Sequence, residues 1–177
     1  MSYRDLYVQV FEKELTPHME KLEELSEKVN IKAWRIVDNP AKESNFISNR
    51  EISILEHIND QDYFDIPSTP KDTKKRSYLK FFGEYGLSSF ESMEECEKYM
   101  NDVYNRIQKN HGEEVAQNFF DKRGWFLAEV DYHVEDGWKL PTNQYGHFDF
   151  IRKPEWNYLT SLTGNYKDLN IKWHKIQ

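Results

Sequence analysis

The chain has 177 residues, a formal net charge of −7 and a single cysteine, Cys96. This length suits one domain, residues 1–177, with a proper hydrophobic core. The acidic balance argues against a nucleic-acid binder held by phosphate contacts. A single cysteine excludes an internal disulfide framework, no signal-peptide pattern opens the chain, and no apolar run reaches the length of a membrane span. We therefore expect a soluble, cytoplasmic protein that does not contact a membrane.

The first quarter of the chain predicts helix and then strand. Apolar residues recur at spacings of three and four over residues 3–29, as in an amphipathic helix. Pro17 either kinks this helix or divides it in two, in which case Thr16 caps the second helix. Residues 32–38 follow as a short strand, because large apolar side chains alternate there with others.

A second helix and a long loop come next. Ser48 and Glu51 form a capping box at the start of a helix over residues 49–58. Residues 59–77 have the weakest pattern in the chain and are predicted to be a loop. Loops this long in a small domain are usually functional or mobile.

The middle of the chain combines one strand with the clearest helix. Residues 77–85 alternate as a strand does. Ser92 caps a helix over residues 93–110, which carries Cys96 on its apolar face and is expected to stop at Gly112. A shorter helix over 113–120 follows.

The last part predicts two strands, a helix and a final strand, at 126–134, 147–151, 154–162 and 169–173. Together the elements indicate a single α+β domain. We expect a mainly antiparallel sheet of about four to five strands, with helices packed on one face.

Five residues that titrate or bind metals gather on the two consecutive strands near the C-terminus. They are Glu129, Asp131, His133, His147 and Asp149. Alternate residues of one strand point the same way, about 7 Å apart. Side by side, the two strands would hold a divalent metal or supply a general acid and base. The identity of any metal or cofactor stays open.

Whether the five residues meet depends on strand register. Asp136-Gly137 is the preferred pair for a two-residue hairpin turn. A regular hairpin would place His147 opposite Phe126, on the apolar side, and the cluster would not form. Pro141 cannot donate to a sheet ladder, so the pairing can also break there and restart with the cluster intact.

No catalytic motif that we tested occurs in the sequence, and the first hypothesis is therefore an intracellular interaction protein of the inhibitor, immunity or regulatory type. It would bind a protein partner through an acidic surface rich in aromatic residues, with Trp138 and Tyr145 as exposed contact groups. The alternatives are a small hydrolase or phosphodiesterase-like enzyme using the five-residue cluster, and a binder of a small ligand such as a nucleotide or sugar. Oligomeric state is not indicated.

Overall fold

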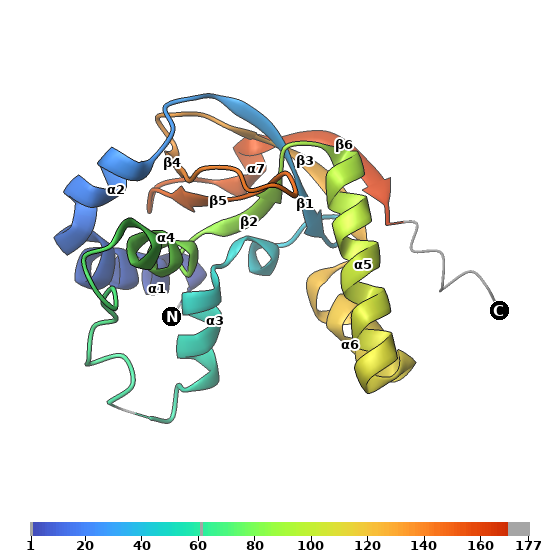
Figure 1. Ribbon diagram of the computed structural model, residues 1–177, viewed down its shortest axis with the longest axis horizontal. Coiled ribbons are helices and arrows are strands. Elements are labelled where there is room, and N and C mark those ends of the chain that lie inside the picture. The colour runs from blue at the N-terminus through green and yellow to red at the C-terminus, as the bar shows by residue number, and fades with distance from the viewer. Residues whose placement is uncertain (1, 61, 170–177) are drawn as a thin grey trace.

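Six antiparallel strands form one sheet in the described part of the chain, residues 2–60 and 62–169 of a computed structural model (Figure 1). Their order across the sheet is β4-β5-β2-β1-β3-β6. The bounds are Ile31–Val37 for β1, Leu87–Phe90 for β2, Phe126–Tyr132 for β3, Gly137–Lys139 for β4, His147–Arg152 for β5 and Leu162–Asp168 for β6. The predicted α+β class is confirmed, but the sheet has more strands than the four to five expected.

Two groups of helices lie against one side of the sheet (Figure 1). The first group packs on β4 and β5 and consists of α1 (Tyr3–Val10), η1 (Phe11–Leu15), η2 (Thr16–His18), α2 (Met19–Leu25), α3 (Asn49–Glu56) and α4 (Lys75–Gly83). The second packs on β1, β2 and β3 and consists of α5 (Met93–His111) and α6 (Glu113–Arg123). The short η3 (Glu43–Phe46) and α7 (Tyr158–Ser161) supply residues to the core on the other side.

The first helical stretch bends at Pro17 without breaking. A π-helical turn, η1, precedes the proline, and a 3-10 turn, η2, contains it. The π turn rotates the helix so that both Glu14 and Leu15 become buried. Thr16 donates to the carbonyl oxygen of Phe11 at 3.2 Å and does not cap α2, so of the two alternatives the kinked helix is the one observed.

The predicted strand at residues 77–85 is wrong, because most of this segment is helix α4. Tyr78, Phe81, Phe82 and Tyr85 recur at the helical spacing of three and four, and they pack into the core below β4 and β5. Five of the nine residues here are large and apolar or aromatic, and their order also fits the alternation of a strand. Burial of the helical face decides between the two.

The other local predictions hold better at their start than at their end. Ser48 and Ser92 cap α3 and α5 as expected, and α5 ends at Gly112, whose φ of +91° is in the left-handed region. The helix predicted over 154–162 is the exception, because it begins late: residues 154–157 form no helix, and Asn157 caps the short α7 by accepting from the backbone N–H of Leu159. The strand predicted over 169–173 lies outside the described residues after Leu169.

A narrow boundary divides the sheet into two half-sheets, β4-β5-β2 and β1-β3-β6. The ladder between β1 and β2 consists of the single pair Trp34 and Phe90. Beside it, Arg35 of β1 donates to the carbonyl oxygens of Ser88 and Asn45 at 2.5 and 2.7 Å. The bond to Ser88 therefore joins β1 to β2 where the ladder is missing, and the bond to Asn45 ties η3 to the same arginine.

On the side away from the two helix groups, one hydrophobic core spans both half-sheets. Tyr132 of β3 stacks on Phe150 of β5 at 4.0 Å between ring centroids. Its hydroxyl also pairs with that of Ser89 on β2 at 2.8 Å. The sheet thus curls until strands that are not neighbours in its order touch through their side chains. Within the described residues, none of the helices combines the length and apolar character needed to cross a bilayer.

Candidate functional site

The five residues of the predicted cluster do not come together. β3 pairs with β1 and β6, whereas β5 pairs with β2 and β4, so two strands separate the pair on β3 from the pair on β5. Glu129 and His147 lie on one line across the sheet, through Trp34 and Phe90. At about 4.8 Å per strand, this line is about 14 Å long.

Both register alternatives assumed that β3 lies beside β5, and both are wrong. Asp136-Gly137 makes no two-residue hairpin, since Asp136 N–H instead donates to the carbonyl oxygen of His133 at 2.9 Å in a turn. The chain then leaves β3 and crosses to the far edge of the sheet. There β4 begins at Gly137, which pairs with Arg152 of β5.

The β3 residues of the cluster make ordinary surface contacts. Asp131 accepts from Lys32 Nζ at 3.1 Å, and Glu129 accepts from Asn165 Nδ2 at 3.1 Å. His133 follows the end of β3 and is exposed. These are contacts of a polar, water-facing part of the sheet, and they bring no reactive groups together.

On the neighbouring strands β2 and β5 the structure gathers a smaller group: Ser88 of β2 with His147 and Asp149 of β5. Ser88 Oγ lies 2.6 Å from Nε2 of His147, and Asp149 Oδ1 lies 3.8 Å from the same nitrogen. Tyr99 of α5 stacks near the imidazole, and Gly86 leaves the space that Asp149 fills, because a Cβ there would lie 2.5 Å from Asp149 Cβ. The group is thus set between α4 and α5.

Burial controls the charges of this group. It raises the pKa of Asp149 from 3.8 to about 6, and Arg35 opposes the rise. It lowers the pKa of His147, and the charge of Arg35 lowers it further. A hydrolytic Ser-His-Asp relay needs the serine and the carboxylate on different imidazole nitrogens. Here both face Nε2, so the geometry does not form that relay.

No group of three or more histidine, cysteine or acidic side chains within residues 2–60 and 62–169 is arranged to hold a metal ion. Cys96 is fully buried in the core of α5 and α6, and burial raises the pKa of its thiol. Its expected core position is confirmed. Such a thiol is a poor nucleophile at neutral pH.

The two aromatic residues expected at a binding surface differ in exposure. Trp138 is only 6% exposed, and its indole N–H donates to Glu23 Oε1 at 2.7 Å, so the expectation that it is exposed is wrong. It packs against Phe11 of η1 as part of the core. Tyr145 is exposed, as expected.

A groove that the sequence did not indicate lies between α1, α3 and the segment after α3. We call it the acidic groove; its volume is about 320 Å³. It is lined by Ser2, Tyr3, Leu6, Gln9, Ile54, Leu55, His57, Ile58, Asp60, Tyr63, Phe64 and Asp65. Leu6 and Ile54 also belong to the core, whereas Leu55 is 36% and Ile58 is 71% exposed. The lining of the groove therefore includes buried core residues at its bottom and exposed apolar residues at its rim.

The charged side chains of the segment that forms one wall of the groove are all acidic, although Lys13 and Arg50 lie against its Phe64 and Tyr63 rings. Residues 51–70 contain five carboxylates and neither lysine nor arginine. Glu51 is buried and paired with Arg152 at 2.7 Å, but the other four carboxylates, on residues 56, 60, 62 and 65, are exposed. Ile66, another exposed apolar residue, lies among them. Apolar surface inside an acidic rim is typical of a binding face.

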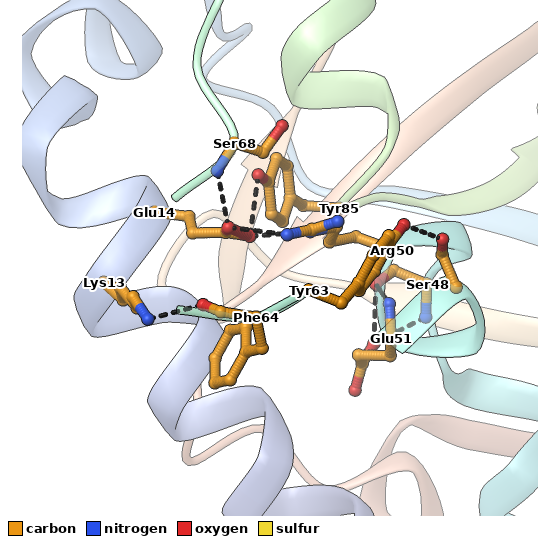
Figure 2. A network of polar contacts seen from close by, with 10 residues as sticks. Lys13, Glu14, Ser48, Arg50, Glu51, Tyr63, Phe64, Ser68 and Tyr85 are labelled. Atoms are coloured by element: carbon orange, nitrogen blue, oxygen red, sulfur yellow. Dashed lines mark hydrogen bonds and ion pairs between the residues drawn. The ribbon is translucent and has the colours of Figure 1, made fainter. Parts of the chain in front are cut away.

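One wall of the groove belongs to the predicted loop 59–77, and a buried carboxylate holds it in place (Figure 2). Glu14, on the π turn, accepts two bonds from Arg50 of α3, at 2.8 and 2.9 Å. It also accepts from Ser68 N–H at 2.7 Å and from the Tyr85 hydroxyl at 3.1 Å. Four segments far apart in sequence meet at this one side chain.

Aromatic contacts hold the same wall closer to its tip. His57 stacks on Tyr63 at 4.1 Å, and the Tyr63 hydroxyl bonds to that of Ser53. Lys13 donates to the carbonyl oxygen of Phe64 (Figure 2). These contacts order the loop around the groove, while its mobility in solution stays a prediction.

One sequence signal marks this region: a run of 20 residues, 51–70, that holds five carboxylates and no basic residue. Comparisons of the chain with protein-family models, with curated proteins and with solved structures find no match.

Proposed function

We propose that the protein binds a partner protein through the acidic groove, and that the partner presents an apolar side chain flanked by lysine or arginine. One observation carries this proposal: Leu55, Ile58 and Ile66 are exposed among carboxylates, in a stretch of sequence that lacks any basic residue. The inhibitor, immunity or regulatory roles predicted from the sequence all require such a contact.

The apolar residues supply a reason for binding. Burying an isoleucine or leucine side chain yields about 1.5–3 kcal/mol, and Ile58 and Ile66 are each more than 70% exposed. The walls of the groove are already ordered in the unbound protein, because the hydrogen bonds of Glu14 and the His57–Tyr63 stack hold them. An ordered surface loses less entropy on association.

The carboxylates supply selectivity. Asp60 and Asp65 line the groove and would attract a basic segment while repelling an acidic one. Because these carboxylates are exposed, we expect the association rate to fall as salt is added. The partner is therefore expected to be selected by its charge and not by its size.

Of the sequence-based alternatives, the hydrolase has lost its geometric basis, since its five residues lie on separated strands. A cytoplasmic location stays part of the proposal and rests on the single, buried cysteine. The small-ligand alternative has a candidate cavity, at the end of β5.

Site-specific photo-crosslinking tests the proposed contact. A photoreactive amino acid is placed at Ile58 in the groove and, as the matched control, at Val115 on α6, which is also exposed. After irradiation in the native cells, the crosslinked partner peptide is sequenced by mass spectrometry. We expect a partner crosslinked from Ile58 and not from Val115, through a segment with apolar and basic residues. Asp60→Asn together with Asp65→Asn should reduce its yield.

Equal crosslinking from both positions would contradict the proposal, as would a contacted segment without lysine or arginine. A partner that binds the double variant as well as the parent would show that the carboxylates are not part of the contact.

A further inference from the structure

A second cavity, of about 360 Å³, lies at the end of β5, between the start of α1, η3 and residues 154–159. Its lining runs from buried side chains, Tyr7, Phe46 and Arg152, to exposed ones, Arg4 and Leu159. We call it the arginine cavity. Its volume is in the range of small-molecule sites.

Two buried hydrogen-bond donors in the lining have no acceptor. Within the described residues, Nη1 of Arg152 and Nε1 of Trp156 are both buried and unpartnered. The rest of the Arg152 guanidinium is fixed: Nη2 donates to Glu51 Oε1 at 2.7 Å, and the group lies 3.7 Å from the ring centre of Tyr7. A donor that is buried, held in place and unmet is costly, so an acceptor is expected beside it.

The arginine retains attraction for an anion although it is paired. Glu51 also accepts from the backbone N–H and the hydroxyl of Ser48, at 2.6 and 2.7 Å. The carboxylate thus divides its hydrogen bonds among three donors, and only one of them comes from Arg152. Charge-assisted bonds from a guanidinium to a carboxylate are among the stronger contacts in proteins.

The walls of the arginine cavity are aromatic. Phe46 stacks on Tyr158 with ring centroids 4.8 Å apart and planes 19° apart, and Trp156 meets Phe46 edge-on at 5.7 Å. A flat, apolar body can pack against the outer faces and edges of such rings. The remaining charges near the exposed end, Arg4, Glu43 and Glu155, include two carboxylates, which disfavours a multiply charged phosphate ligand.

We propose that the arginine cavity binds a small aromatic monocarboxylate, whose carboxylate oxygens accept from Nη1 of Arg152 and Nε1 of Trp156 while its ring packs on Phe46 and Tyr158. This ligand would be a metabolite or an effector that binds apart from the partner protein, since among the described residues only Tyr3 lines both the arginine cavity and the acidic groove. The proposal does not depend on the acidic groove.

Benzoate is the probe, and nuclear magnetic resonance of the tryptophan indole N–H groups is the readout. We expect benzoate to shift the Trp156 indole proton downfield, with a dissociation constant on the order of 1 mM for so small a ligand. Trp138, whose indole N–H already donates to Glu23, serves as the internal control and should not shift. Benzamide, the neutral analogue, and acetate, which lacks the ring, should each bind several-fold more weakly.

The Trp156→Phe variant assigns the signal and removes one donor while keeping a ring. We expect it to bind benzoate roughly tenfold more weakly, with its unfolding temperature little changed. Trp125→Phe, outside the cavity, should bind as the parent does. An indole proton of Trp156 that stays unshifted at saturating benzoate would overturn the site. Equal binding of benzamide would overturn the anion, and full binding by Trp156→Phe would overturn the role of the indole.

Discussion

Replacement of Asp149 by asparagine is expected to stabilise the protein near pH 8 and to change its stability little near pH 4. The Asp149 side chain is only 25% exposed and packs against Gly83 and Gly86 on the helix side of β5. Its pKa rises from 3.8 to about 6, chiefly through burial. Asparagine has nearly the same shape but carries no charge at any pH.

The direction of this pH dependence follows from how strongly the folded and unfolded states bind the Asp149 proton. Because the folded-state pKa is the higher one, the folded protein holds the Asp149 proton over a pH range in which the unfolded chain has lost it. The resulting stabilisation is complete below pH 3.8 and is lost as the pH rises through about 6. Relative to the parent, Asp149→Asn should gain about 0.5 kcal/mol near pH 4 and about 3 kcal/mol near pH 8.

Urea unfolding of both proteins at the two pH values measures this difference. With the slopes typical of small proteins, a change of about 2.5 kcal/mol moves the midpoint by about 1 M urea. Asp131→Asn, a partly exposed aspartate on the same sheet face that pairs with Lys32, is the control and should respond much less. A gain from Asp149→Asn that is equal at both pH values, or a loss near pH 8, would refute the inferred burial of the charge.

Two further variants test the buried network and the backbone. Arg50→Ala should lower the free energy of unfolding by about 3–5 kcal/mol, because it leaves the fully buried Glu14 without its ion pair; a loss below about 1 kcal/mol in urea unfolding would contradict this role. Gly124→Ala should cost about 3–5 kcal/mol, since φ is +108° and a Cβ would lie 2.2 Å from the carbonyl carbon of Val37. Gly112→Ala is its matched control: φ is +91° but no atom lies within 4 Å, so thermal unfolding should show a loss of only about 1–2 kcal/mol.

Predictions from the sequence succeeded where neighbouring residues decide the structure. The capping serines Ser48 and Ser92 fix where α3 and α5 begin through bonds to residues three positions away. The sequence-based prediction failed at residues 77–85, where a segment rich in aromatic residues fits the pattern of a strand as well as that of a helix. Only the core beneath β4 and β5 selects the helix, and that core is assembled from segments distant in sequence.

The candidate sites were harder to predict for the same reason. His147 and Asp149 were correctly expected on one face of a strand, but their neighbours on that face were not, because β5 pairs with β2 and not with the strand before it. Ser88 therefore escaped notice. Similarly, Arg152 reads as an ordinary charged residue at a strand end until Glu51 and Tyr7, each more than 100 positions away, are brought against it.

The single Trp34–Phe90 pair between the half-sheets has a consequence for how the protein comes apart. The chain alternates between the two half-sheets. In chain order, α1 and α2, then α3, α4 and β2, and then β4 and β5 lie on the β4-β5-β2 side. Between and after them, β1, then α5, α6 and β3, and finally β6 lie on the β1-β3-β6 side. No cut in the polypeptide can free one side as a continuous fragment. If either half-sheet unfolds, the other is left with unpaired strand edges and with segments that are not continuous in sequence. The two half-sheets are therefore expected to unfold together, as a single cooperative unit, although few hydrogen bonds join them.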